Sequence, residues 1–238
     1  MSDAEAMTSR RQQLAVNLAR VEDRITEACQ ASGRSRNEVT LVVITKTYPA
    51  LDVELLADLG VTDVGENRHP EAGDKHDAVA QSAHPPRLRW HFVGGLQTNK
   101  AAAVARYADV VHSVDRIKLV AALDKGAAAA GSTLECLVQV GLSDDAGRSG
   151  ATPHDVLAVA EAIERSEHLT LGGVMAVAPL EADPTVAFSE LGTIAAVIRS
   201  AYPHATTISA GMSGDLEEAV MAGATHLRIG RSVLGERP

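Results

Sequence analysis

Lys46 is the residue of this chain best placed for covalent chemistry. It follows the apolar run 40-TLVVIT-45, shares a strand face with Val42 and Ile44, and has no acidic residue within five positions. An ammonium group in such a place loses hydration, which favours the neutral amine that Schiff-base chemistry requires. Two other interpretations stay open: the amine reaches the rim of the fold, or it pairs with a carboxylate from another loop.

Arg228 is the second candidate, because its neighbours alternate in character. In 225-THLRIG-230, Leu227 and Ile229 share one strand face and Arg228 lies on the opposite one. If the apolar pair faces an outer layer of helices, Arg228 points to the inside. An arginine stays charged in proteins, so it needs an anion or another acceptor there. That partner is either a buried glutamate in an ion pair or a bound ligand.

The segment 230-GRSVLG-235 can open a short helix whose backbone N–H groups hold an anion. The loop 209-SAGMSGD-215 adds small and hydroxyl-bearing residues, but Asp215 and the acids after it repel phosphate at the start of their own helix. We therefore expect a phosphate mainly at the helix after Gly230, with Ser213 reaching across. An amine, a buried arginine and a phosphate site together suit an aldehyde-bearing phosphate, either pyridoxal phosphate (PLP) or a sugar phosphate.

Eight short β-branched runs, separated by longer segments of helical period, must position these side chains. The runs are 40-TLVVIT-45, 61-VTDVG-65, 88-LRWHFV-93, 109-DVVHSV-114, 134-LECLVQV-140, 170-TLGGVMAV-177, 206-TTIS-209 and 225-THLRIG-230. Parallel strands that alternate with helices are typical of βα units, and eight of them predict a single closed (β/α)8 TIM barrel. A doubly wound open sheet is the alternative, but the glycine-rich turn expected in that fold is missing from 44-ITKTYPA-50.

The helices are predicted from the segments between these runs. An additional N-terminal helix over about residues 8–31, stopped at Gly33, precedes the first run. The other helical segments are 51–60, 97–108, 115–130, 153–166, 184–201 and 214–223, and 143-SDDAGRSG-150 is expected to form a turn. In such a barrel the active site lies at the carboxyl ends of the strands, where Lys46 and the segment after Gly230 both fall.

The composition excludes several classes of protein. The chain has 238 residues, is 45% hydrophobic and carries a net charge of −9, without dense Lys/Arg runs, which argues against nucleic acid and anionic membranes as partners. Its two cysteines, Cys29 and Cys136, are too few for a disulfide framework and are not spaced as metal ligands. No apolar run approaches the about 20 residues of a membrane span, and the polar N-terminus shows no signal peptide. We expect a cytoplasmic protein without a metal site.

Several sequence blocks follow one another in an order that is specific to one family. The blocks are 41-LVVITKTYP-49, 64-VGENR-68, 90-WHFVGGLQTNK-100, 112-HSVDR-116, 138-VQVGLSDDAGRSG-150, 172-GGVMAVAP-179, 209-SAGMSGDLEEAVMAGATHLRIG-230 and 233-VLG-235. From about residue 10 to the C-terminus the chain resembles the pyridoxal-phosphate homeostasis protein family. The resemblance implies the fold of the alanine racemase barrel domain, a single PLP-binding domain over residues 1–238, a monomer, and PLP held as an internal aldimine.

The resemblance also implies a set of cofactor-binding residues by position. They are Lys46 for the aldimine, Asn67 beside the cofactor, Met212 lining the site, Ser213 with the backbone of Gly230 and Arg231 at the phosphate, and Arg228 at the pyridine nitrogen. A fixed cation at that nitrogen disfavours its protonation, which makes the ring a weaker electron sink. The chain departs from the family at Arg231, where Thr or Ser is common, and at 66-ENRHPE-71, where ENYVQE is frequent.

A carrier and an enzyme are the two functional classes that follow from the resemblance. A racemase needs a base on each face of the substrate carbanion. In the related racemases the second base is a tyrosine from a separate domain of the partner subunit, whereas this sequence ends eight residues after Gly230. We expect a PLP carrier in vitamin B6 and amino/keto-acid homeostasis, with apo PLP-dependent enzymes as recipients and no catalytic residues. A PLP-dependent racemase or lyase is the alternative, and a sugar-phosphate aldolase is disfavoured by Arg228.

Overall fold

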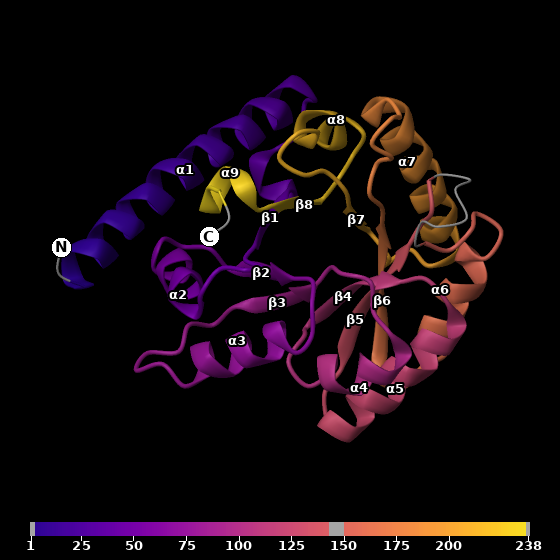
Figure 1. Cartoon of the computed structure of the whole chain (residues 1–238). Coiled ribbons are helices and arrows are strands. Elements are labelled where there is room, and N and C mark those ends of the chain that lie inside the picture. Colours follow the sequence, from indigo (N-terminus) through magenta and orange to yellow (C-terminus); the bar gives the residue numbers. More distant parts are fainter. Residues whose placement is uncertain (1–2, 143–149, 237–238) are drawn as a thin grey trace.

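Eight parallel strands close into a barrel in the computed structural model, which describes residues 3–142 and 150–236 (Figure 1). The strands are β1 (Thr40–Ile44), β2 (Asp63–Glu66), β3 (Arg89–Phe92), β4 (Val110–Val114), β5 (Leu134–Gln139), β6 (Leu169–Met175), β7 (Thr207–Ser209) and β8 (His226–Ile229). Each strand pairs with the next, and β1 closes the ring against β8, with Val42 opposite Arg228. Each of the eight predicted runs overlaps one of these strands, so the predicted TIM barrel is confirmed.

Helices connect the strands and cover the outside of the barrel (Figure 1). They are α1 (Asp3–Ala31), α2 (Ala50–Asp58), α3 (Glu71–Ala80), α4 (Ala101–Val104), α5 (Ile117–Ala130), α6 (Val156–Glu164), α7 (Pro184–Ala201), α8 (Leu216–Met221) and α9 (Arg231–Leu234), with short 3-10 helices η1 (Arg36–Glu38) and η2 (Thr98–Lys100). α1 is the expected additional helix, and the chain turns after it at Gly33, which adopts a φ of 68°. The turn expected at 143–150 lies outside the described residues, apart from Gly150.

The sequence analysis does not predict α3, and its composition explains why. The helix reads EAGDKHDAVA, and its inward face consists of Ala72, Lys75 and Val79, which are all buried. These positions have the i, i+3, i+7 spacing of an amphipathic helix, but a lysine occupies the central position. A search for apolar residues at helical spacing therefore fails here, because the helix buries a charge at the site end of the barrel.

The barrel wall separates two layers of buried side chains. Outward-facing side chains such as Val43, Leu227 and Ile229 join one continuous apolar cluster with the helices. Inside the barrel, the β4–β6 side carries a second, small apolar cluster made of Val110, Leu137 and Met175. Five further interior side chains are buried and polar: Asp63, His91, His112, Ser209 and Arg228. The interior is thus half apolar and half polar, and Arg228 belongs to the polar half.

The long helix α1 lies across the outside of the barrel beside α8 and α9 (Figure 1). Arg24 of α1 donates to the backbone oxygen of Ser213 and to both carboxylate oxygens of Glu217, and Asn17 donates to the backbone oxygen of Val233. α1 therefore fixes the two segments that follow β7 and β8. No helix within residues 3–142 and 150–236 combines the length and apolar character that crossing a membrane requires.

Candidate functional site

Lys46 lies at the carboxyl end of β1, two residues after the last strand residue. Its side chain is half-buried, and the residues on both sides of it are held by side chains from β2 and α3. On one side, Thr45 Oγ1 donates to Glu66 Oε1 at 2.7 Å. On the other, the backbone N–H of Thr47 donates to Glu71 Oε1 at 2.6 Å, and Thr47 adopts a φ of 70°, which is rare for a β-branched residue. The position of Lys46 is therefore imposed from β2 and α3.

A buried ion pair between Lys75 and Glu66 holds Thr45 in place. Lys75 Nζ donates to Glu66 Oε1 at 2.6 Å and to the backbone oxygen of Thr45 at 2.7 Å. Glu66 is 1% exposed and Lys75 is 7% exposed. Burial raises the pKa of Glu66, against the lowering effect of its bonds from Lys75 and Thr45. Thr45 is thus held by its hydroxyl and by its carbonyl, directly before the site lysine.

Arg228 points into the barrel from β8 and is 5% exposed. Its Nη1 donates to Ser209 Oγ at 2.6 Å, and its Nη2 donates to the backbone oxygen of Ala176 at 2.8 Å. Among the described residues no carboxylate forms an ion pair with it. Burial lowers the pKa of Arg228 to about 10, although the charge of Asp215 acts in the opposite direction. The sequence left open a structural ion pair between Arg228 and a barrel glutamate. The structure shows two neutral acceptors for Arg228 instead.

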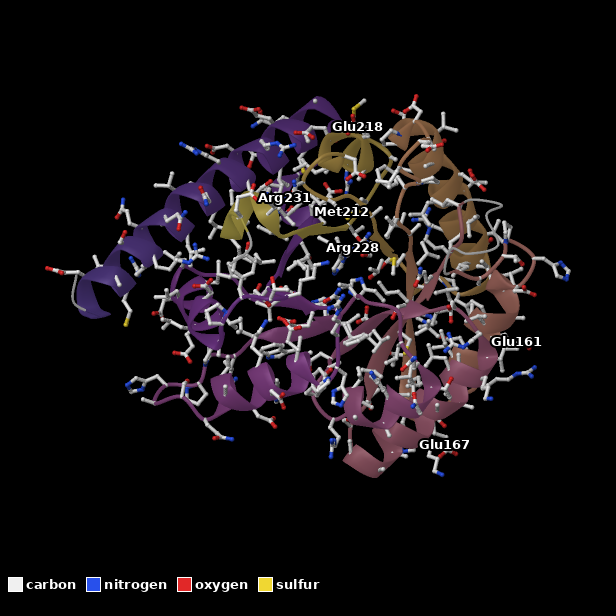
Figure 2. The ribbon with its side chains drawn as sticks, in the orientation of Figure 1. Glu161, Glu167, Met212, Glu218, Arg228 and Arg231 are labelled. Atoms are coloured by element: carbon white, nitrogen blue, oxygen red, sulfur yellow. The ribbon has the colours of Figure 1, made fainter. Side chains whose placement is uncertain are left out.

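The segments after β7 and β8 bring the remaining predicted residues to the same end of the barrel. Arg231 opens α9, and Met212 lies in the loop before α8 (Figure 2). The Met212 side chain is 38% exposed, whereas Ser213 is half-buried in the same loop. The Asp215 carboxylate accepts from the backbone N–H of Met212 at 2.6 Å, so this acid holds its own loop together.

Gly230 is where α9 comes closest to β1. A Cβ atom on Gly230 would lie 3.2 Å from the backbone oxygen of Ile44 and 3.4 Å from its Cβ. The backbone oxygen of Gly230 accepts from the N–H groups of Val233 and Leu234, which closes the first turn of α9. The N–H groups of Arg231 and Ser232 precede that turn, and helix geometry gives them no partner within the helix. They are the donors that this end of the barrel offers to an anion.

Asn67 directly follows β2 and is half-buried. A Cβ atom on Gly94, after β3, would lie 2.0 Å from the backbone oxygen of Asn67, so only glycine permits this close approach of the two loops. Around the barrel the strand order is β2–β1–β8–β7. Asn67, Lys46, Gly230 with Arg231, and Met212 with Ser213 therefore follow four consecutive strands.

Sequence reasoning missed the residues that support this site. Lys75 lies on the helix that was not predicted, and Glu66 ends β2 without an assigned role. His112 and Ser209, from strands far apart in the sequence, contact each other inside the barrel, with Ser209 Oγ 2.9 Å from His112 Nδ1. The alternation of polar and apolar residues along β3, β4 and β8 could have indicated this cluster, because each of these strands carries a histidine on its inward face.

We expect His226 to make the protein less stable in acid. Burial lowers the pKa of His226 from 6.5 to about 4. Between these pH values, His226 is protonated in the unfolded chain and neutral in the folded protein. The free energy of unfolding therefore decreases as the pH falls through that window. The full loss corresponds to about 3 kcal/mol. Urea unfolding at several pH values between 7.5 and 4 measures it.

The matched variant for this effect is His226→Asn, whose amide can replace the 3.0 Å contact between His226 Nδ1 and Thr225 Oγ1. Its stability should fall less steeply with acid than that of the parent protein. His112 titrates in both proteins, so only the difference between the two curves reports on His226. Two curves of equal slope would contradict the expectation.

Known proteins resemble this chain in sequence over nearly its whole length. Residues 16–238 match the family model described as alanine racemase, N-terminal domain. The pyridoxal phosphate homeostasis protein of Mycobacterium tuberculosis is 40% identical over 251 aligned residues, which cover 99% of this chain and 97% of that protein. The protein of the same name from Escherichia coli is 35% identical, over 94% of this chain and 97% of its own length.

Solved structures agree with these relatives. PipY of Synechococcus elongatus, with PLP bound, superposes with a TM-score of 0.81 at 30% identity, covering 93% of this chain and all of PipY. An alanine racemase from Corynebacterium glutamicum, 14% identical, shares the fold with a TM-score of 0.68 over 96% of this chain and 61% of the racemase. With a family model over most of its length and near-full-length relatives well above 30% identity, the chain belongs to the pyridoxal phosphate homeostasis protein family.

Proposed function

We propose that this protein binds PLP at the carboxyl end of its barrel, through a Schiff base with Lys46, and acts in PLP homeostasis as a carrier of the cofactor. The names of its near-full-length relatives and the PLP bound to PipY support the binding of this cofactor. The balance of amino and keto acids belongs to the same proposal, since PLP is a cofactor of enzymes that interconvert them.

The observation that best supports the proposal is that Arg228 is buried without a carboxylate partner among the described residues. A buried guanidinium has five N–H groups, of which two are used in the bonds to Ser209 and Ala176. A buried cation without a carboxylate partner is costly, and an acceptor on a ligand relieves that cost. The pyridine nitrogen of PLP is such an acceptor, and it carries no proton that would clash with the guanidinium. The donor set of the site therefore fits this cofactor.

The phosphate of the cofactor would be held by the segments after β7 and β8. The backbone N–H groups that open α9 and the Ser213 hydroxyl supply donors, and Met212 and Asn67 would border the ring on either side. The side chain of Arg231 is exposed, so it adds positive charge at the rim and leaves the contact itself to the backbone. The departure from the family at this position thus changes the side chain and keeps the backbone donors.

The same arginine favours a carrier over an enzyme. When bound, PLP supplies an aldehyde that links reversibly to amines and a ring that can accept electrons when its nitrogen is protonated. Arg228 keeps a proton away from that nitrogen, because two positive charges in one buried place repel each other. The ring then accepts electrons weakly. We also propose that residues 1–238 work as one monomeric cofactor-binding unit and that apo PLP-dependent enzymes receive the cofactor.

We expect the PLP-loaded protein to activate an apo PLP-dependent enzyme without itself exchanging the Cα–H of amino acids. The first part is measured by the recovered activity of the recipient after free PLP has been removed by gel filtration. The second is measured by mass spectrometry of alanine incubated with the loaded protein in deuterated water. Exchange at roughly 1 per second or faster would favour a racemase or lyase and contradict the carrier function.

A further inference from the structure

A chain of hydrogen bonds runs through the polar half of the barrel interior. Asp63 Oδ1 lies 2.9 Å from His91 Nε2, and His91 Nδ1 lies 2.8 Å from His112 Nε2. His112 Nδ1 lies 2.9 Å from Ser209 Oγ, which accepts from Arg228 Nη1 at 2.6 Å. All five side chains are buried, and they come from five different strands. The chain connects the first residue of β2, at the amino end of the barrel, with the arginine of the site.

With both imidazoles neutral, the two ends of this chain determine the direction of every bond in it. Arg228 can only donate to Ser209, and an ionised Asp63 can only accept. His91 therefore carries its proton on Nε2, toward Asp63, and its Nδ1 accepts from the Nε2–H of His112. The Nδ1 of His112 in turn accepts the hydroxyl proton of Ser209. With both imidazoles neutral, this is the one arrangement that satisfies every link, and a second proton on either ring would reverse at least one of them.

The electrostatic surroundings agree with this arrangement. Burial disfavours the charge on Asp63, but hydrogen bonds from His91 and Thr62 outweigh it and lower the pKa of Asp63. Burial, together with the charge of Arg228, holds the pKa of His112 well below its ordinary value, which keeps this imidazole neutral. Within the described residues, no three His, Cys, Asp or Glu side chains are arranged to hold a metal ion. Hydrogen bonding accounts for the cluster.

Ser209 is the link through which the histidines act on the site. A serine hydroxyl rotates freely, and only an acceptor on its far side keeps its hydrogen away from Arg228. His112 Nδ1 is that acceptor, and it remains unprotonated only because Asp63 and His91 fix the proton positions behind it. Without this order, the hydroxyl hydrogen can turn toward the guanidinium, and Arg228 then loses one of its two acceptors.

We propose that Asp63, His91, His112 and Ser209 are positioning residues: their one-directional hydrogen-bonded chain fixes the Ser209 hydroxyl and thereby holds Arg228 in place for the cofactor. The effect on PLP rests on the proposed function, whereas the proton positions are a property of the protein alone. The amino end of the barrel thus contributes to a site that lies at the carboxyl end.

Nitrogen-15 NMR of the protein without cofactor tests the proton positions. At neutral pH we expect both His91 and His112 to be neutral, with the proton on Nε2. A proton on Nδ1 of either residue, or on both nitrogens, overturns the proposal. Because no cofactor is present, this result is independent of whether PLP binds. If PLP fails to bind the parent protein while the proton positions are as expected, the proposed function is wrong. The hydrogen-bonded chain inside the barrel is then still supported.

Two substitutions at Asp63 test the coupling to the site. Both Asp63→Ala and Asp63→Asn remove the charge, but only the alanine variant removes the acceptor for His91. In Asp63→Ala we expect mixed proton positions on both histidines and a Kd for PLP about fivefold higher, equivalent to about 1 kcal/mol or one net hydrogen bond. The amide oxygen of Asp63→Asn should rescue both readouts. Equal effects of the two variants, or none in Asp63→Ala, overturn the proposal.

Ser209→Ala breaks the chain at its other end and removes one oxygen atom only. The proton positions on the histidines should persist, since Asp63 still sets them, while the Kd for PLP rises about fivefold. This variant serves as the test if Asp63→Ala does not fold. An unchanged Kd in Ser209→Ala would show that the chain does not reach Arg228 and would overturn the proposal.

Discussion

Lys75→Met should be one of the most destabilising single substitutions in this protein, lowering the free energy of unfolding by about 3–5 kcal/mol. It removes the ammonium group that donates to Glu66 Oε1 and to the backbone oxygen of Thr45. Glu66 is 1% exposed, and its Oε2 already accepts no hydrogen bond from the described residues. The remaining carboxylate would be a buried charge held only by the Thr45 hydroxyl.

The double variant Glu66→Gln/Lys75→Met separates the charge from the packing. Removing both charges of a buried pair costs far less than removing one, so the double variant should be more stable than Lys75→Met alone. Urea unfolding of the parent, both single variants and the double variant gives the coupling directly. If the two single losses simply add, the pair is not coupled and the interpretation is wrong.

The pH dependence provides a second measurement of the same effect. A buried carboxyl group whose pKa is raised binds a proton more readily when folded than when unfolded, so its cost disappears as the pH falls. Without Lys75, the pKa of Glu66 should rise further, because burial then acts with less opposition. The deficit of Lys75→Met relative to the parent should therefore shrink between pH 8 and pH 5. A constant deficit would indicate lost packing around the lysine side chain.

Lys75 also shows where prediction from the sequence ends. The β-branched runs are long and regular enough to predict eight strands, and the strand ends then place Lys46 and Gly230 at one face of the barrel. The alternation around Arg228 predicts its direction, since Leu227 and Ile229 need an apolar layer. The burial of Lys75 is not predicted, because in the sequence a lysine on the inward face of a helix looks the same as a surface lysine until its buried partner is known.

The hydrogen-bonded chain was out of reach for a related reason. Its links join β2 to β3, β3 to β4, and β4 to β7, so it depends on strand register, which one sequence does not contain. The register of β4 even shifts between Val111 and Val114. Periodicity shows that His91 and Arg228 share their faces with particular neighbours. It cannot show that His112 lies opposite Ser209.

Lys46→Ala should abolish covalent attachment of the cofactor while leaving the fold intact. Lys46 is half-buried at the end of β1, outside the apolar layers, so shortening it leaves no cavity in the core. The donors of Arg228 and of the backbone after Gly230 remain, so the variant should still bind PLP weakly and reversibly. Borohydride reduction of the PLP-loaded parent, followed by peptide mass spectrometry, should place the reduced cofactor on Lys46. In Lys46→Ala the label should fall to the level of a sample without PLP.

The matched control is Lys100→Ala. Lys100 ends η2, after β3, where its Nζ donates to the backbone oxygen of His69. It offers a second amine on the connection that follows β3, two strands away from β1. Among the described residues, however, no side chain from another element binds both of its neighbours as Glu66, Lys75 and Glu71 bind Thr45 and Thr47. The control should keep the full label on Lys46. Persistence of the label in Lys46→Ala, or its transfer to Lys100, would mean that the amine is selected by exposure alone. Loss confined to Lys46→Ala would place the attachment at Lys46, the amine whose two neighbours are held by Glu66, Lys75 and Glu71.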